Sequence, residues 1–143
     1  MGTKRIETED EIKAYVARMK YALNTNAKIT FQINRKVDEE RDIKYTNRYT
    51  IAELFPDDNP KDVLRRELLA LSVKDYQYTV KDDRYPKRSE MRVFGKTYND
   101  DDVYIKIRVE LMSTADCGEH SVFVMSFHFS EIPFSKDDFP YRM

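Results

Sequence analysis

The chain has 143 residues, 41% of them hydrophobic and 36% charged, with a net charge of −1 at neutral pH. This composition predicts one globular domain over residues 1–143, and the near-neutral charge argues against strong nonspecific attraction to nucleic acid. The single cysteine, Cys117, excludes an internal disulfide, and no apolar signal segment or membrane-spanning run occurs, so we expect a cytoplasmic protein without a membrane partner.

The N-terminal part predicts a helix followed by a strand. The stretch "TEDEIKAYVARMKYALN" begins with Thr8 and Glu11 in capping-box spacing and places apolar residues on one helical stripe. The stretch "KITFQINRK" then alternates apolar and polar residues, as a half-buried strand does. Residues 36–48 are charged and indicate a loop or an exposed extension of this strand.

Two further helical segments precede the C-terminal half. "YTIAELF" predicts a short helical turn capped by Thr50. "NPKDVLRRELLALS" predicts a helix with Asn59 as N-cap and Pro60 in the first helical position. Its apolar face comprises Val63, Leu64, Leu68 and Leu71.

The pattern then changes to four strands, at 76–80, 91–97, 103–111 and 121–129. "YNDDD" reads as a hairpin turn between the second and third of these strands, and "STADCGEH" reads as a looser connection. The order of elements predicts an α+β fold, in which an antiparallel sheet is packed on one face against the N-terminal helices. Residues 135–143 are expected to form a C-terminal tail.

The last two strands predict which residues lie on the sheet face away from the helices. Alternation along 103–111 places Tyr104, Lys106 and Arg108 on that face. In strand 121–129, the four bulky residues Phe123, Met125, Phe127 and Phe129 are expected to be buried, leaving Val122, Val124, Ser126 and His128 opposite. Strand 91–97 is expected to add its even-numbered residues, Arg92, Phe94 and Lys96, to the same open face.

A local excess of basic residues supports a binding role for this face. Between residues 81 and 96, six basic residues face three acidic ones, Asp82, Asp83 and Glu90, an excess of three. The basic residues are Lys81, Arg84, Lys87, Arg88, Arg92 and Lys96. Cleavage of RNA without metal needs a base for the 2′-hydroxyl proton, an acid for the leaving 5′-oxygen and cations for the charge on phosphorus. His128, Tyr104 and these cations could supply such groups.

Simpler explanations exist for each of these features. His128 can be a hydrogen-bonded structural residue, and alternating Lys and Arg usually mark a solvated strand face. The aspartates 100–102 read as a solvated turn more readily than as a magnesium site. Cys117 and His120 are spaced as half of a zinc site, but the chain lacks the other ligands, and a nucleophilic Cys117 has no further support. We therefore expect neither a metal nor a cofactor.

Several short motifs together resemble one known family. "VLRRELLALSVKDY", "MRVFGK", "VYIKIRV" and "VMSFHFSE", with "KITFQINRK" and "YTIAELF" upstream, resemble the MqsR-like toxins of type II toxin–antitoxin systems in their order and spacing, over roughly residues 10–134. The resemblance implies a compact RelE-like fold and an mRNA interferase, which is an RNA-cleaving toxin neutralised by a cognate antitoxin and in some cases active on the ribosome. It also implies that Tyr104, Lys106 and His128 line the cleavage site.

Two positions depart from the family pattern. Tyr78 stands where the best-known members have a lysine, and Val93 stands where they have a glutamine. The sequence thus leaves two hypotheses. One is a metal-independent endoribonuclease with catalytic His128, Tyr104 and Lys106, in which RNA is bound by Arg92, Lys96, Lys81, Arg84 and Tyr78. The other is an inactive RNA- or protein-binding module that keeps the toxin fold.

Overall fold

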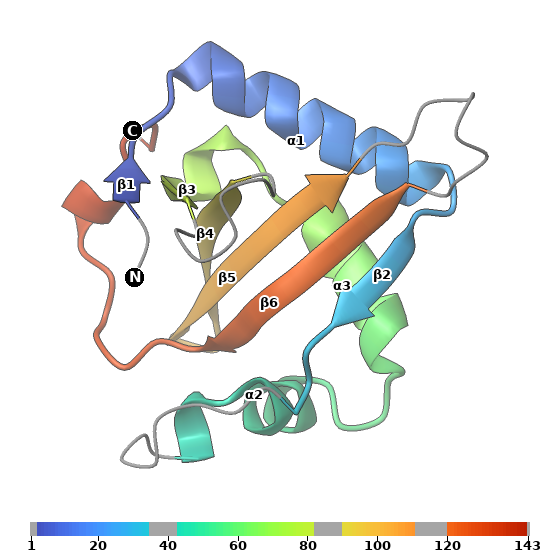
Figure 1. Ribbon diagram of the computed structural model, residues 1–143. Coiled ribbons are helices and arrows are strands. Elements are labelled where there is room, and N and C mark those ends of the chain that lie inside the picture. The colour runs from blue at the N-terminus through green and yellow to red at the C-terminus, as the bar shows by residue number, and fades with distance from the viewer. Residues whose placement is uncertain (1–2, 35–42, 82–89, 111–119, 143) are drawn as a thin grey trace.

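The computed structural model describes residues 3–34, 43–81, 90–110 and 120–142, and it has an α+β architecture (Figure 1). The helices are α1 (Glu9–Asn24), α2 (Asn47–Leu54) and α3 (Pro60–Leu69). The strands are β1 (Thr3–Arg5), β2 (Lys28–Phe31), β3 (Tyr76–Lys81), β4 (Met91–Tyr98), β5 (Asp101–Glu110) and β6 (Ser121–Phe129). Among the described residues there are also three short 3₁₀ turns: η1 (Ile43–Tyr45), η2 (Val73–Asp75) and η4 (Lys136–Asp138).

The two long helices begin at the capping residues that the sequence predicts. At α1, Glu11 N donates to Thr8 Oγ1 (3.2 Å) and Thr8 N donates to the Glu11 carboxylate (3.1 Å), which completes the capping box. At α3, Asn59 Oδ1 accepts from the backbone at the first turn, next to Pro60. The predicted cap of the short helix is wrong, because α2 begins after Thr46 and contains Thr50 in its interior.

The six strands form one sheet in the order β1-β3-β4-β5-β6-β2. All pairs are antiparallel except β2 and β6, which run parallel, so the prediction of a wholly antiparallel sheet is wrong at this edge. The strand β1 was not predicted, because its exposed residues show no apolar alternation and its pairing with β3 is through the backbone. The predicted hairpin at "YNDDD" is confirmed: Asn99 and Asp100, both with positive φ, connect β4 to β5.

The helices α1 and α3 cover one face of the sheet, while α2 lies beside the end of β6 (Figure 1). The core between them is made of α1 and α3 side chains packed on the inward residues of β4, β5 and β6. These strand residues are Phe94, Val103, Ile105, Ile107, Val122, Val124, Phe127 and Phe129. In the described part of the chain, no helix has the length and apolar character needed to cross a membrane.

The C-terminal segment folds back over the sheet beyond β6. Asp102 holds its start, because Asp102 O accepts from Ser130 N (2.9 Å) and the Asp102 carboxylate accepts from Phe134 N (2.8 Å). Further on, Phe134 and Phe139 pack against β4 at Gly95, where an added Cβ would lie only 2.7 Å and 3.0 Å from their rings. The predicted tail is thus a packed part of the molecule.

Candidate functional site

The strand β5 follows its predicted alternation and provides two residues of the candidate site. Val103, Ile105 and Ile107 are buried in the core, whereas Tyr104 and Lys106 lie on the face away from the helices. The register sets Tyr104 opposite His128 and Lys106 opposite Ser126 on β6. Four polar or aromatic side chains therefore share one patch of the sheet, as the sequence predicted for this pair of strands.

The strand β6 departs from strict alternation at Met125. The partner of Lys106 is Ser126 and the partner of Ile107 is Val124, so Met125 is an extra residue and forms a β-bulge. The prediction that Phe123 and Met125 are buried opposite Val122 and Val124 is wrong, because the bulge reverses the parity of this half of the strand. Val122 and Val124 are in the core, whereas Phe123 and Met125 are partly exposed.

Side chains of α2 hold the bulged edge of β6 in place. Asn47 Nδ2 donates to Met125 O (2.9 Å) and to Gln32 O (2.7 Å), and Asn47 Oδ1 accepts from Phe127 N (3.0 Å). Thr50 Oγ1 accepts from Phe129 N (2.8 Å). These bonds replace the strand partner that β6 loses where β2 ends, and they stabilise the register that puts His128 on the open face.

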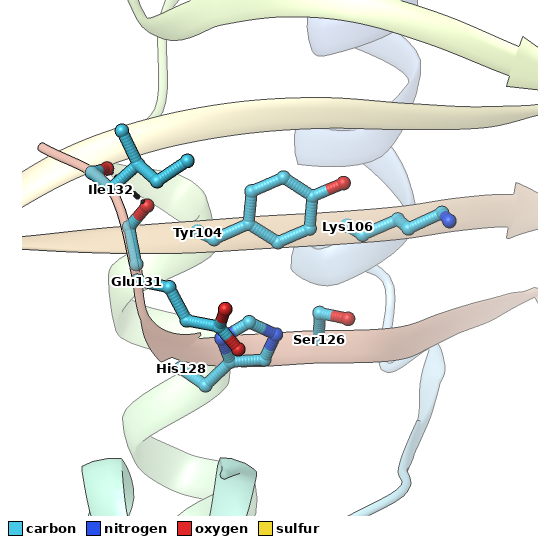
Figure 2. Close-up of a pocket in the computed structure, with 7 residues that line it drawn as sticks. Tyr104, Lys106, Ser126, His128, Glu131 and Ile132 are labelled. Carbon is cyan, nitrogen blue, oxygen red and sulfur yellow. Dashed lines mark hydrogen bonds between the residues drawn. The ribbon is translucent and has the colours of Figure 1, made fainter. Parts of the chain in front are cut away.

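A pocket of about 300 Å³ lies over this patch (Figure 2). It is lined by Tyr104 and Lys106 from β5, by Ser126 and His128 from β6, and by Ser130, Glu131 and Ile132 from the segment after β6. Figure 2 shows the Glu131 side chain extending from the segment after β6 toward His128. The three residues after β6 were not assigned to the site from the sequence. The local sequence carried no signal for them, because the fold-back depends on the distant anchor at Asp102.

His128 is nearly buried and has a defined orientation. Its side chain is only 9% exposed, and its ring stacks on Tyr104 with centroids 5.5 Å apart and an interplanar angle of 23°. Its Nδ1 lies 2.9 Å from Phe129 O. Because a carbonyl oxygen can only accept, Nδ1 must carry a proton, and the neutral ring then has Nε2 as its basic nitrogen.

Tyr104 makes a second contact on the far side of β4. Its hydroxyl lies 2.6 Å from the hydroxyl of Tyr78 on β3. The Lys4 ammonium from β1 lies 4.4 Å from the centre of the Tyr78 ring. Tyr78, which the sequence assigned to RNA binding, is therefore coupled directly to the predicted catalytic tyrosine.

The predicted placement of Arg92, Phe94 and Lys96 on the open face is wrong. The partners of Tyr104 and Lys106 on β4 are Gly95 and Val93, so the odd-numbered residues of β4 share their face. Phe94 is buried in the core, and Lys96 lies 3.7 Å from the Asp75 carboxylate. The misassignment arises because strand parity alone does not tell which face is which.

Arg92 is held in a nearly buried ion pair with Glu7. The Arg92 side chain is 13% exposed and donates from Nε (2.8 Å) and Nη2 (3.0 Å) to the Glu7 carboxylate. Burial disfavours the charged form of Glu7, but hydrogen bonds from Arg92 and Thr79 outweigh it and hold the pKa of Glu7 below its ordinary 4.5. Both Arg92 and Lys96 thus lie outside the pocket.

The other predicted RNA-binding residues are placed only in part. Lys81 is exposed at the end of β3, opposite Thr3. Arg84 and Cys117 fall outside the described residues. Val93 is the second position that departs from the family pattern. It is the register partner of Tyr78 on β3 and of Lys106 on β5.

The pocket therefore joins a stacked histidine and tyrosine, a lysine, a serine and a carboxylate in one small hollow. Such a set can accept a proton, donate a proton and stabilise negative charge without a metal ion. Comparison with known proteins adds nothing to this description: no family model, no curated protein and no solved structure matches the chain.

Proposed function

We propose that this protein is a metal-independent endoribonuclease of the MqsR-like toxin type, with a RelE-like fold, acting on mRNA in the cytoplasm. The observation that carries the proposal is the convergence of Tyr104, Lys106 and His128 on one pocket, at the register positions 104↔128 and 106↔126. The resemblance of the motifs to that family supplies the substrate class.

The geometry favours separate roles for the three residues. His128, with Nδ1 held by Phe129 O at 2.9 Å, has Nε2 as the nitrogen that can take the proton of the 2′-hydroxyl. Tyr104 would protonate the leaving 5′-oxygen, and the Lys106 ammonium would stabilise the charge that develops on the phosphoryl oxygens. The products would be a 2′,3′-cyclic phosphate and a free 5′-hydroxyl.

The direct test is cleavage of single-stranded RNA by the purified protein and by three variants. His128→Gln, Tyr104→Phe and Lys106→Met should each slow cleavage, the first by about 10²–10⁴-fold. Glutamine is preferable to alanine at 128, because the side chain is 9% exposed and stacked on Tyr104, so truncation would also cost stability. Strand parity alone would suggest that His128 is exposed and that His128→Ala costs little stability, but the observed burial of His128 contradicts this.

The other histidine provides a matched control. His120 precedes β6 at the opposite end of that strand and contacts the exposed Tyr21, with ring centroids 5.6 Å apart. His120→Gln should therefore leave the cleavage rate unchanged. If His128→Gln cleaves RNA as fast as the wild type does, His128 has no catalytic role.

The toxin assignment has its own test in the cell. Expression of the chain alone should arrest growth, and co-expression of the adjacent open reading frame should relieve the arrest if it encodes the cognate antitoxin. Normal growth with abundant soluble protein would contradict the assignment. Ribosome dependence is read by comparing cleavage of naked and translated mRNA.

One observation favours the alternative, an inactive binding module. The nearly buried His128 is bordered by Glu131 and Ile132 from the segment after β6, which narrows access to the ring. Such a module would bind RNA or protein with wild-type affinity in the His128→Gln variant and would never cleave. Filter binding and cleavage measured on the same preparations separate the two functions.

A further inference from the structure

Tyr78 and Tyr104 form a pair of hydroxyls that the roles described above leave unexplained. The two oxygens are 2.6 Å apart, which is a short hydrogen bond between groups that can each donate and accept. Neither residue is near the other in sequence, and they come from β3 and β5, with β4 between them. The contact between them therefore depends on the tertiary structure of the sheet.

Two residues of β4 are the register partners of the two tyrosines. The partner of Tyr78 on β4 is Val93, and the partner of Tyr104 is Gly95. Figure 2 shows the Tyr104 ring rising from β5 with its hydroxyl directed toward β4 and along β5 in the direction of Lys106. The hydroxyl therefore contacts Tyr78 and lies on the side of the ring toward Lys106, which also lines the pocket.

The surroundings of Tyr78 favour one direction for the hydrogen bond. The Lys4 ammonium lies 4.4 Å from the centre of the Tyr78 ring. A cation over the face of a phenol attracts electron density from the ring and makes its O–H a better donor. With Tyr78 as the donor, the Tyr104 oxygen accepts this bond, and the Tyr104 O–H is the donor on the pocket side of the pair.

We infer that Tyr78 and Tyr104 act as one proton-donating unit, in which Tyr104 is the acid and Tyr78 is the positioning residue that stabilises its phenolate. The inference rests on the proposed ribonuclease function. The 2′-oxygen forms its bond to phosphorus and gives its proton to His128 Nε2. The bond from phosphorus to the 5′-oxygen breaks, its electron pair stays on that oxygen, and Tyr104 supplies the proton. The Tyr104 phenolate accepts the hydrogen bond from Tyr78 until solvent returns the proton from His128.

The pair can be tested without any activity assay. In protein labelled with ¹³C at the phenolic carbon of tyrosine, the Tyr104 signal is assigned by its loss in Tyr104→Phe and is then followed with pH. Tyr78→Phe should raise the midpoint of Tyr104 ionisation by about one pH unit, a tenfold change in acid dissociation. Lys4→Met should move it in the same direction by less, and Tyr21→Phe, at an exposed tyrosine, should leave it unchanged.

The kinetic test uses steady-state cleavage of the same RNA. Tyr78→Phe should lower kcat about tenfold at unchanged KM, and combining it with Tyr104→Phe should add no further loss, because Tyr78 acts only through Tyr104. A merely structural role would instead lower the melting temperature and act additively.

The two possible failures are distinguishable. If the wild type cleaves RNA but Tyr78→Phe leaves both the Tyr104 titration and kcat unchanged, the inference is wrong and the proposed function stands. If the wild type cleaves no RNA, the proposed function fails and the catalytic role of the pair fails with it.

Discussion

Glu7 joins the N-terminal segment to the rest of the molecule, and its replacement by glutamine tests the assignment of Arg92 to the fold. The Glu7 side chain is 5% exposed. Its carboxylate accepts from Arg92 at 2.8 Å and 3.0 Å and from Thr79 Oγ1 at 2.6 Å. Its backbone N–H donates to Tyr76 Oη (3.1 Å), and its carbonyl accepts from Tyr141 near the C-terminus.

The expected loss of stability is large. Glu7→Gln keeps the size of the side chain but leaves the Arg92 guanidinium, 13% exposed, without its counter-charge. Removing one partner of a buried ion pair costs about 3–5 kcal/mol. For a chain of this length, roughly 3 °C of melting temperature is lost per kcal/mol, so the midpoint should fall by about 10–15 °C. The exposed Glu53 on α2 provides the control, and Glu53→Gln should shift it by less than about 2 °C.

Circular dichroism during thermal and urea unfolding measures this effect, and a double variant isolates the pair. Glu7→Leu with Arg92→Met replaces both charges by apolar groups, which is often neutral or stabilising at buried pairs. Most of the stability lost in either single variant should therefore return in the double variant. RNA cleavage by the double variant should match the wild type, because Arg92 lies outside the pocket.

The pH dependence has a definite sign. The pKa of Glu7 is below its ordinary 4.5 in the folded state, so its contribution is complete above that value and is lost as the pH falls through the lowered pKa. The stability difference between the wild type and Glu7→Gln should thus be constant near neutral pH and shrink in acid. This account would be refuted if Glu7→Gln lost less than about 1 kcal/mol of unfolding free energy and Arg92→Met bound RNA more weakly than the wild type. Arg92 would then be an RNA-binding residue, as the sequence predicted.

Three further predictions concern the bulge, the packing on β4 and metal. Asn47→Ala should cost about 2–3 kcal/mol in urea unfolding, because it leaves the buried Phe127 N–H unpaired, whereas Asn24→Ala should change stability little. Gly95→Ala should cost about 1–3 kcal/mol, since the new Cβ would meet the Phe134 ring at 2.7 Å, and Phe134→Leu should relieve part of that loss. RNA cleavage should persist in excess EDTA. If EDTA abolishes cleavage and magnesium restores it, the aspartates 100–102 are the candidates for the catalytic site in place of His128.

The local elements of this protein were predictable because their signals lie within a few residues. Thr8 with Glu11, and Asn59 with Pro60, satisfy backbone groups of their own first turns, so the starts of α1 and α3 follow from short-range chemistry. The alternation of β5 was equally readable, since its odd-numbered residues are all apolar from Val103 onward. These parts include two of the three residues on which the proposed function depends, Tyr104 and Lys106.

The faces of β4 and β6 could not be read from alternation, because the deciding contacts are long-range. In β6 the bulge at Met125 is held by Asn47, which lies 78 residues earlier in the chain. In β4 the choice between the two faces follows from the pairing of Gly95 with Tyr104. Consequently the sequence predicted correctly that His128 lies beside Tyr104. It also predicted Arg92 on the same face, whereas Arg92 lies on the opposite face and pairs with Glu7.

Sequence alone thus determined the starts of α1 and α3, the β4–β5 hairpin and the placement of a histidine, a tyrosine and a lysine on neighbouring strands. Tertiary structure alone decided the parallel pairing of β2 with β6, the Glu7–Arg92 ion pair, the contact between Tyr78 and Tyr104, and the return of Glu131 and Ile132 to the pocket. The physical reason is that caps and hairpins are stabilised by neighbours in the chain. Strand faces, buried charges and pocket walls are instead stabilised by residues that come together only when the whole sheet has formed.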